Sequence, residues 1–287
     1  MSFSVELGLL LALLTAFGSV AGFLYKFRGA RAAAAVELQH PWRSTVELFR
    51  SPLYSLGILI ALLSWGFHVG ALALAPISLV QSVIAGGLVL LTVVADHVFG
   101  IEVTRREWVG VGLTAAGLAF LAATLDGDGG GAHSSYDPAT LAVFLIALGT
   151  VGLALALRPR RAGFLAVSAG LLWATSDTSI KALSSHLSAL GLGVVVHPLA
   201  VVILVASLVG LLISARSLQL GDAVPTIALT SAAANLTTIA AGPLVFGEPL
   251  PESRLGVAVR LLAFAFVIVA AALTPPPAPR PDHIANP

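Results

Sequence analysis

Residues 51–82 read SPLYSLGILIALLSWGFHVGALALAPISLVQS, and this stretch contains no Asp, Glu, Lys or Arg. A helix needs about 20 mostly apolar residues to cross the hydrocarbon core of a bilayer. The stretch is long enough for one crossing at 53–74 and for the start of another at Pro76. It therefore predicts membrane-spanning helices.

The composition extends this interpretation to the whole chain, which has 287 residues, 57% of them hydrophobic and 10% charged. Soluble domains are about 45–50% apolar and about 25% charged. The composition therefore excludes a soluble enzyme and a disordered chain. With 15 basic and 14 acidic residues there is no basic surface for nucleic acid, and the absence of cysteine excludes disulfides and cysteine-bound metals.

Several further segments resemble the first one in length and polarity. We predict an all-α polytopic membrane protein with nine transmembrane helices, at 5–25, 53–74, 76–99, 108–125, 139–157, 163–183, 192–213, 223–246 and 255–273.

The basic residues predict which side of the membrane each loop faces, because Lys and Arg collect in cytoplasmic loops. Twelve of the 15 lie near alternate loops or the C-terminal tail: Lys26, Arg28, Arg31, Arg43, Arg50, Arg105, Arg106, Arg158, Arg160, Arg161, Arg216 and Arg280. We therefore expect the N-terminus outside and the C-terminus in the cytoplasm. Arginine outnumbers lysine 13 to 2, which favours a GC-rich bacterial source and hence the bacterial cell membrane.

The two halves of the chain share short matches in the same order. The residues FGIE at 99–102 correspond to FGE at 246–248, and ALALA at 71–75 corresponds to SLQLG at 217–221. Lys26 follows Gly8 by 18 positions, as Lys181 follows Gly163. Because the halves begin five spans apart, they are predicted to be inverted repeats, which are typical of secondary transporters.

This repeat divides the chain into four parts. Residues 1–125 form the first membrane repeat, with a cytoplasmic segment at 26–51, and 162–274 form the second. Residues 126–161 comprise an external loop, a linking fifth span and a basic cytoplasmic loop, and 275–287 form a Pro-rich, disordered cytoplasmic tail. Glu102 and Glu248 lie in tight turns, where we expect each to cap or anchor the helix that follows.

Several of these residues resemble a known family. The glycine-ended first span with Lys26, the run ALALAPISLVQS at 71–82, the Gly-x-Glu turn before WVGVG at 108–112 and WATSDTSIK at 173–181 are similar to the drug/metabolite transporter superfamily, of the EamA-like type. The resemblance covers roughly 5–273 and implies two inverted repeats around a transport site. Most of that superfamily has ten spans, whereas here the charged, amphipathic segment 29–51 replaces the second. The nine-span layout looks more like the NIPA-type branch, which is associated with magnesium transport.

Asp177 is the only acidic residue well inside a predicted span, and such residues are functional candidates by default. Lys181 lies one helical turn further on the same face, so the two can pair. Two interpretations stay open: Asp177 forms a substrate or proton site, or Asp177 and Lys181 form a structural pair that locks helix packing.

Other polar side chains complete the candidate substrate-binding set: His68, Gln81 and Arg260 at a similar depth, Thr178 beside Asp177, and Asn235 nearer the midplane. A histidine can exchange a proton near neutral pH, so His68 could sense or shuttle one. Arg260 could bind an anionic group in a bidentate manner or neutralise Asp177. Each of these side chains could equally be a hydrogen-bonded packing residue.

The first functional hypothesis is a secondary transporter that moves a small polar or amphipathic metabolite by alternating access. The second is a transporter of magnesium or another divalent cation, for which Asp177 would be the metal ligand. The third is a non-transporting membrane scaffold. No HExxH, GxSxG or Walker sequence is present, so we expect no enzyme and no cofactor. The expected partners are a small molecule or ion and the lipid bilayer, and a homodimer is left open.

Overall fold

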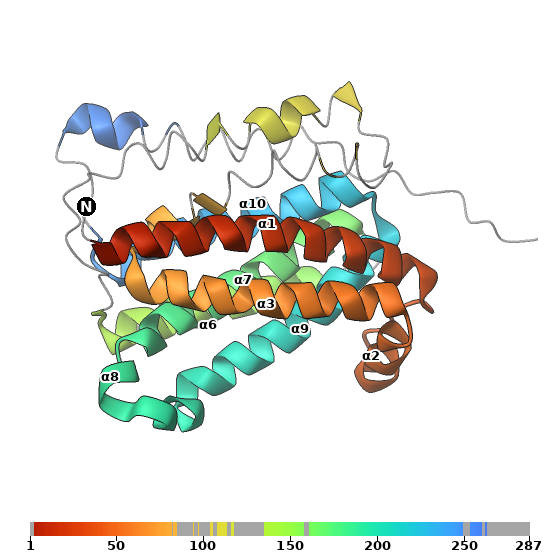
Figure 1. Cartoon of the computed structure of the whole chain (residues 1–287), viewed down its shortest axis with the longest axis horizontal. Helices are drawn as coiled ribbons and strands as arrows, with labels where there is room; N and C mark the ends of the chain where they lie inside the picture. The colour runs from red at the N-terminus through yellow and green to blue at the C-terminus, as the bar shows by residue number, and fades with distance from the viewer. Residues whose placement is uncertain are drawn as a thin grey trace, which may run out of the picture.

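The computed structural model describes residues 3–81, 83–84, 94, 97, 104–105, 108–113, 116–117, 135–157, 161–248, 253–259 and 262. Within these residues all regular structure is helical (Figure 1). The elements are α1 (Phe3–Ala32), α2 (Pro41–Phe49), α3 (Pro52–Leu74), α6 (Pro138–Ala156), α7 (Ala162–Ser184), α8 (Leu187–Leu190), the 3₁₀ helix η1 (Gly191–Val196), α9 (Pro198–Leu220) and α10 (Ala223–Val245). A further helix begins at Ile77.

Five of the described helices, α1, α3, α6, α9 and α10, are long and apolar enough to cross a membrane. Helix α7 and the segment Leu187–Val196 meet the same requirement together but are bent by 60° at the break between them, and they would make a sixth span if they cross as one. The chain is therefore a multi-pass membrane protein built of helices. The predicted spans at 76–99, 108–125 and 255–273 lie largely outside the described residues, as do residues 126–134 and the tail at 275–287.

Three of these helices begin with the same local chemistry, a capping side chain followed by proline at the first helical position. Ser51 accepts a hydrogen bond from the Tyr54 N–H in α3, and His197 accepts one from the Leu199 N–H in α9. Asp137 starts α6 by accepting from the Thr140 N–H at 2.8 Å, and this bond lowers the pKa of its carboxyl group. Capping satisfies N–H groups that have no partner within the helix, and proline has no N–H to satisfy.

Helix α1 is longer than predicted, because it continues through Lys26 to Ala32 instead of ending near residue 25. The predicted end of the first span near residue 25 is therefore seven residues short of the end of the helix. Gly29 lies where this last part of α1 packs against α3: a Cβ atom there would lie 2.2 Å from the Tyr54 backbone nitrogen, so only glycine lets the two helices pack this closely. The amphipathic connection expected at 29–51 is reduced to a short loop and α2.

The predicted seventh span begins too early. Residues 192–196 belong to η1, and the long helix α9 starts only at Pro198. Gly191 has a φ of 52°, a conformation that favours glycine, and it ends α8 before the chain turns into η1.

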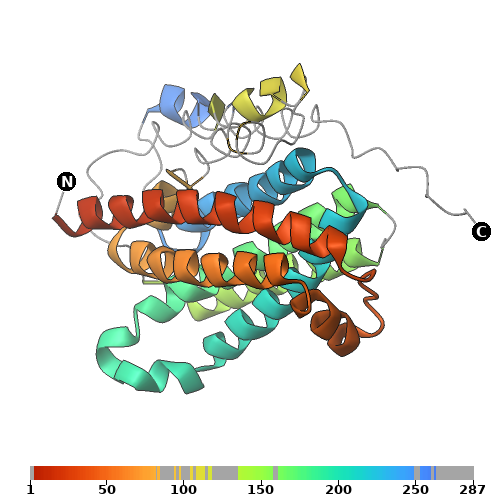
Figure 2. The ribbon, with the colours of Figure 1, turned by 45° about the vertical axis from the view of Figure 1, so that its right-hand side comes forward.

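The helices pack as two groups, α1 with α3 and α6 with α7, α9 and α10, which meet mainly where α1 contacts α9 and α3 contacts α7. Helix α1 lies beside α3, and α7 contacts α6, α9 and α10 (Figures 1 and 2). Helix α2 lies at one end of the bundle and α8 with η1 at the opposite end. Large apolar side chains on α3, α6 and α9 are exposed, including Leu63, Val143 and Val201. Exposed apolar helix faces of this kind suit contact with lipid.

Candidate functional site

A cavity of about 710 Å³ lies between α1, α3, α7, α9 and α10. Most of its lining is apolar, with aromatic rings contributed by Phe23, Trp65 and Trp173. Four of the predicted site residues also line it: His68, Gln81, Asp177 and Asn235. A largely apolar cavity with a few polar groups is the usual form of a small-molecule site.

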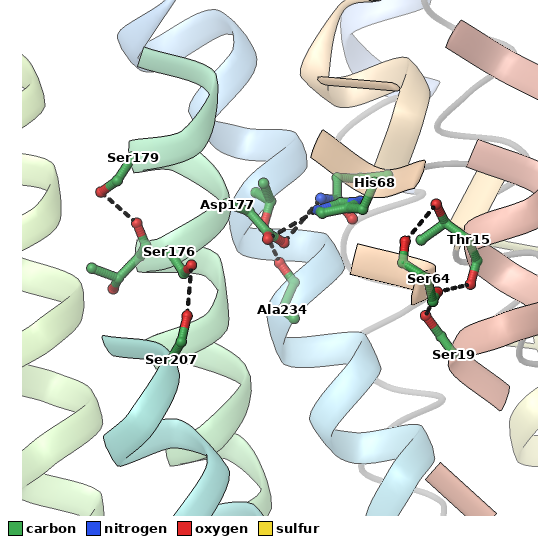
Figure 3. A network of polar contacts seen from close by, with 12 residues as sticks. Thr15, Ser19, Ser64, His68, Ser176, Asp177, Ser179, Ser207 and Ala234 are labelled. Carbon is green, nitrogen blue, oxygen red and sulfur yellow. Dashed lines mark hydrogen bonds and ion pairs between the residues drawn. The ribbon is translucent and has the colours of Figure 1, made fainter. Parts of the chain in front are cut away.

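Asp177 is the centre of the polar cluster in this cavity (Figure 3). One carboxylate oxygen, Oδ1, lies 2.9 Å from Nε2 of His68, and the other, Oδ2, accepts a hydrogen bond from Nε2 of Gln81 at 3.1 Å. The three side chains come from α7, from α3 and from the helix that begins at Ile77. The other ring nitrogen of His68, Nδ1, is buried and has no hydrogen-bond partner among the described residues.

Hydroxyl groups surround this cluster on the neighbouring helices (Figure 3). The Ser64 hydroxyl donates to the Thr15 carbonyl oxygen at 2.9 Å and lies 3.1 Å from the Ser19 hydroxyl, which ties α1 to α3. Ser176 and Ser207 make a similar contact of 3.1 Å between α7 and α9. These hydrogen bonds join the helices that line the cavity. None of them involves Asp177, whose side-chain contacts are with His68 and Gln81.

Lys181 does not pair with Asp177, so the hypothesis of a structural pair between them is wrong. Its side chain is completely buried, and its ammonium group donates to the backbone carbonyls of Leu72 at 2.8 Å and Ala75 at 2.7 Å. The reason lies in Pro76, which has no N–H and so leaves the Leu72 carbonyl without its helical partner. Lys181 supplies the missing donor at the end of α3.

Glu248 contacts the other side of the break at Pro76, where the next helix begins at Ile77. It is 4% exposed and accepts hydrogen bonds from the Ile77 N–H at 2.7 Å and from the Ser78 hydroxyl. Glu248 therefore caps the start of the helix at Ile77, far away in sequence, and the expectation that it caps the helix following it is wrong. We call Leu72, Ala75, Ile77, Ser78, Lys181 and Glu248 the Lys181 corner.

A second corner has related contacts at the end of α9. The Arg31 guanidinium donates to the Gly221 carbonyl at 2.8 Å and to the Leu218 carbonyl at 3.5 Å, and it lies 3.9 Å from the Asp222 carboxylate. The side chains of Arg31 and Asp222 are 23% and 43% exposed, so this corner is more open than the first. We call Arg31, Leu218, Gly221 and Asp222 the Arg31 corner.

The remaining predicted residues do not join the cavity cluster. Thr178 is buried, and its hydroxyl has no hydrogen-bond partner within the described part of the chain and is not part of the cavity lining. Arg260 lies outside the described residues. Among the residues that the structure covers, no three His, Asp or Glu side chains are grouped so as to hold a metal ion.

Lys26, one of the twelve basic residues that predict the cytoplasmic side, also lines the cavity. It is 6% exposed, and its ammonium nitrogen lies 4.1 Å from the centre of the Phe23 ring and 5.4 Å from that of Trp173. The sequence repeat does not indicate this contact, because Lys181 follows Gly163 as Lys26 follows Gly8 but does not line the cavity.

Comparisons of the chain with protein-family models, with curated proteins and with solved structures give no match in any of the three.

Proposed function

We propose that the protein is a secondary transporter that moves a small polar or amphipathic metabolite across the cell membrane by alternating access. The observation that carries this proposal is the cavity between α1, α3, α7, α9 and α10, which holds an ionisable cluster inside an apolar lining. Ionisable groups are costly to place among membrane helices and are concentrated in substrate and proton pathways.

The His68–Asp177 contact supports coupling of transport to protons. A histidine hydrogen-bonded to a carboxylate can take up and release a proton, and no described residue occupies Nδ1 of His68, which can receive one. Gain of that proton would change the charge at the centre of the cavity. A charge change of this kind is what links substrate binding to a proton gradient.

The inverted repeat is part of the proposal, together with nine spans and a cytoplasmic C-terminus. Helices α3 and α9 both have 23 residues, and their first residues, Pro52 and Pro198, are 146 positions apart, like Ala71 and Ser217. The carbonyls at the end of each helix accept hydrogen bonds from a basic residue of the other half, which is Lys181 for α3 and Arg31 for α9. Such a reciprocal exchange supports halves of opposite orientation that could rock against each other around a shared cavity.

A divalent-cation transporter of the NIPA type is the second candidate, and the contacts of Asp177 argue against it. Mg²⁺ is usually held by one or two carboxylates and its own water. Both Asp177 oxygens already contact nitrogens, from His68 and Gln81, and Lys26 adds a positive charge to the same cavity.

The test is uptake by proteoliposomes that contain the purified protein, with and without a pH gradient, using a panel of metabolites and Mg²⁺. We expect gradient-dependent uptake of an organic compound, which Asp177→Asn abolishes. Asp137→Asn is the matched control, because it removes an exposed carboxylate while keeping a side chain that can cap α6. Saturable Mg²⁺ uptake that depends on Asp177 would favour the second candidate, and transport of no compound in the panel would favour a scaffold.

A further inference from the structure

We propose that Lys26 is an anion-binding group and that the cavity takes an amphipathic organic anion, whose acidic group lies at Lys26 and whose apolar body lies against the aromatic rings beside it. This inference rests on the proposed function, since it names the chemical class of the substrate. It starts from the surroundings of the Lys26 ammonium group.

The Lys26 side chain is 6% exposed, and its ammonium group faces two aromatic rings, those of Phe23 and Trp173. Among the described residues it has no carboxylate and no carbonyl oxygen within bonding distance. A buried charge without a hydrogen-bonding partner is unfavourable, and contact with aromatic faces offsets only part of that cost. The group therefore has unused capacity for an anion.

Lys181, the other buried lysine, has an ammonium group with hydrogen-bond partners and so provides a comparison. Lys181 donates to two carbonyl oxygens and does not line the cavity, whereas Lys26 lines the cavity and has neither bond within the described part of the chain. The Lys26 ammonium group is thus the one of the two that a ligand in the cavity could contact.

A second buried polar side chain in the cavity also lacks a hydrogen-bond partner among the described residues. The Asn235 amide is 4% exposed and lines the cavity, and none of the described residues hydrogen-bonds to it. Asp177, in contrast, already contacts His68 through one oxygen and Gln81 through the other. The buried side chains of the cavity that have no hydrogen-bond partner among the described residues are therefore a cation and a neutral amide, a pair that suits an anion better than an organic cation.

The shape of the lining indicates that this anion has an apolar body. The rings of Phe23 and Trp173 are 5.2 Å apart at their centres, and both line the cavity next to Lys26. Asp177 follows Trp173 by four residues, about 6 Å along α7. A molecule bound at Lys26 would extend past Trp173 toward the His68–Asp177 contact, so its binding can influence the group proposed to carry the proton.

The test uses purified full-length protein in nanodiscs of phosphatidylcholine and measures binding by quenching of tryptophan fluorescence and by thermal shift. The probes share one apolar body and differ in charge: phenylpropionate, phenylethyl phosphate, phenylpropylamine and phenylpropanol. We expect the two anions to bind more tightly than the amine and the alcohol by about tenfold or more, as a charge-assisted contact provides. The carboxylate and the phosphate are separate arms, and the tighter one identifies the acidic group.

Lys26→Met should remove that preference by weakening anion binding about tenfold while leaving phenylpropanol binding unchanged. Arg28→Met is the matched control, because it removes one positive charge two residues away on an exposed position of α1 that does not line the cavity. It should leave the preference intact. The comparison of probes on the unaltered protein needs no variant, so it tests the anion preference of the cavity even if Lys26→Met does not fold.

Equal binding of all four probes, no binding of any, or an anion preference that survives Lys26→Met would overturn the assignment. So would displacement of the anions by added phosphatidylglycerol, which would assign Lys26 to a lipid headgroup. These outcomes are distinct from failure of the proposed function. Anion binding at Lys26 without uptake into proteoliposomes would refute transport alone, and uptake of amines or alcohols that is insensitive to Lys26→Met would refute only the anion site.

Discussion

Lys181 and Lys26 are the two lysines of the chain, and both lie inside helices with almost no exposed surface, yet their surroundings are opposite in kind. Lys181 is bonded to the end of α3 by two carbonyl oxygens, and Glu248 interacts with it electrostatically. Lys26 has two aromatic rings and an open cavity. The contrast shows that burial of a charge does not by itself indicate its role, and that its hydrogen-bond partners do.

The largest effect on stability is expected for Lys181→Met, which keeps the length of the side chain but removes its donors. The Leu72 carbonyl then has no partner, because Pro76 cannot provide one. Loss of two charge-assisted hydrogen bonds should lower the free energy of unfolding by about 3–5 kcal/mol. Thermal unfolding in detergent measures this, and a midpoint equal to that of the unaltered protein would show that the Lys181 corner is not structural.

A smaller effect is expected for Glu248→Gln, which keeps an oxygen for the Ile77 N–H but removes the charge near Lys181. We expect a loss of about 1–3 kcal/mol. Because the two residues belong to one corner, the double variant with Lys181→Met should lose less than the two single losses combined. Strict additivity in the same unfolding measurement would mean that the two side chains act independently.

Among the variants of the two corners, the smallest loss of stability is expected for Arg31→Gln, which tests the more open corner. Arg31 makes one short hydrogen bond, to Gly221 at 2.8 Å, and one long one, to Leu218 at 3.5 Å, and water reaches both Arg31 and Asp222. Exposed ion pairs are screened, so the loss should be about 1 kcal/mol or less. If Arg31→Gln and Lys181→Met destabilised the protein equally, the greater exposure of the Arg31 corner would not reduce its contribution to stability.

Much of this architecture could be predicted from the sequence, because a long run of apolar residues without charges is typical of a membrane-spanning helix. The extents of α3 and α10 agree closely with the predicted spans at 53–74 and 223–246. The depth of polar residues within those runs also pointed to His68, Gln81, Asp177 and Asn235, which the fold gathers around one cavity. Their roles in binding stay predictions.

The partners of the charged residues could not be predicted, because they are backbone groups of distant helices. No pattern near Lys181 indicates that the Leu72 carbonyl needs a donor, and none near Glu248 indicates the N–H groups at Ile77. The cavity contact of Lys26 could not be predicted either. The rule that basic residues collect at the cytoplasmic ends of spans does not indicate which way a side chain points, and Lys26 lies within α1.

The contrast between the two lysines is decided by thermal unfolding of Lys26→Met and Lys181→Met beside the unaltered protein, in the same detergent and without ligand. Replacing a buried charge that lacks hydrogen-bond partners by an apolar side chain of similar size is neutral or stabilising. We therefore predict that Lys26→Met unfolds at the same temperature as the unaltered protein or at a higher one, while Lys181→Met unfolds well below it. A decrease for Lys26→Met as large as that for Lys181→Met would refute this assignment, since it would make Lys26 a structural residue like its counterpart.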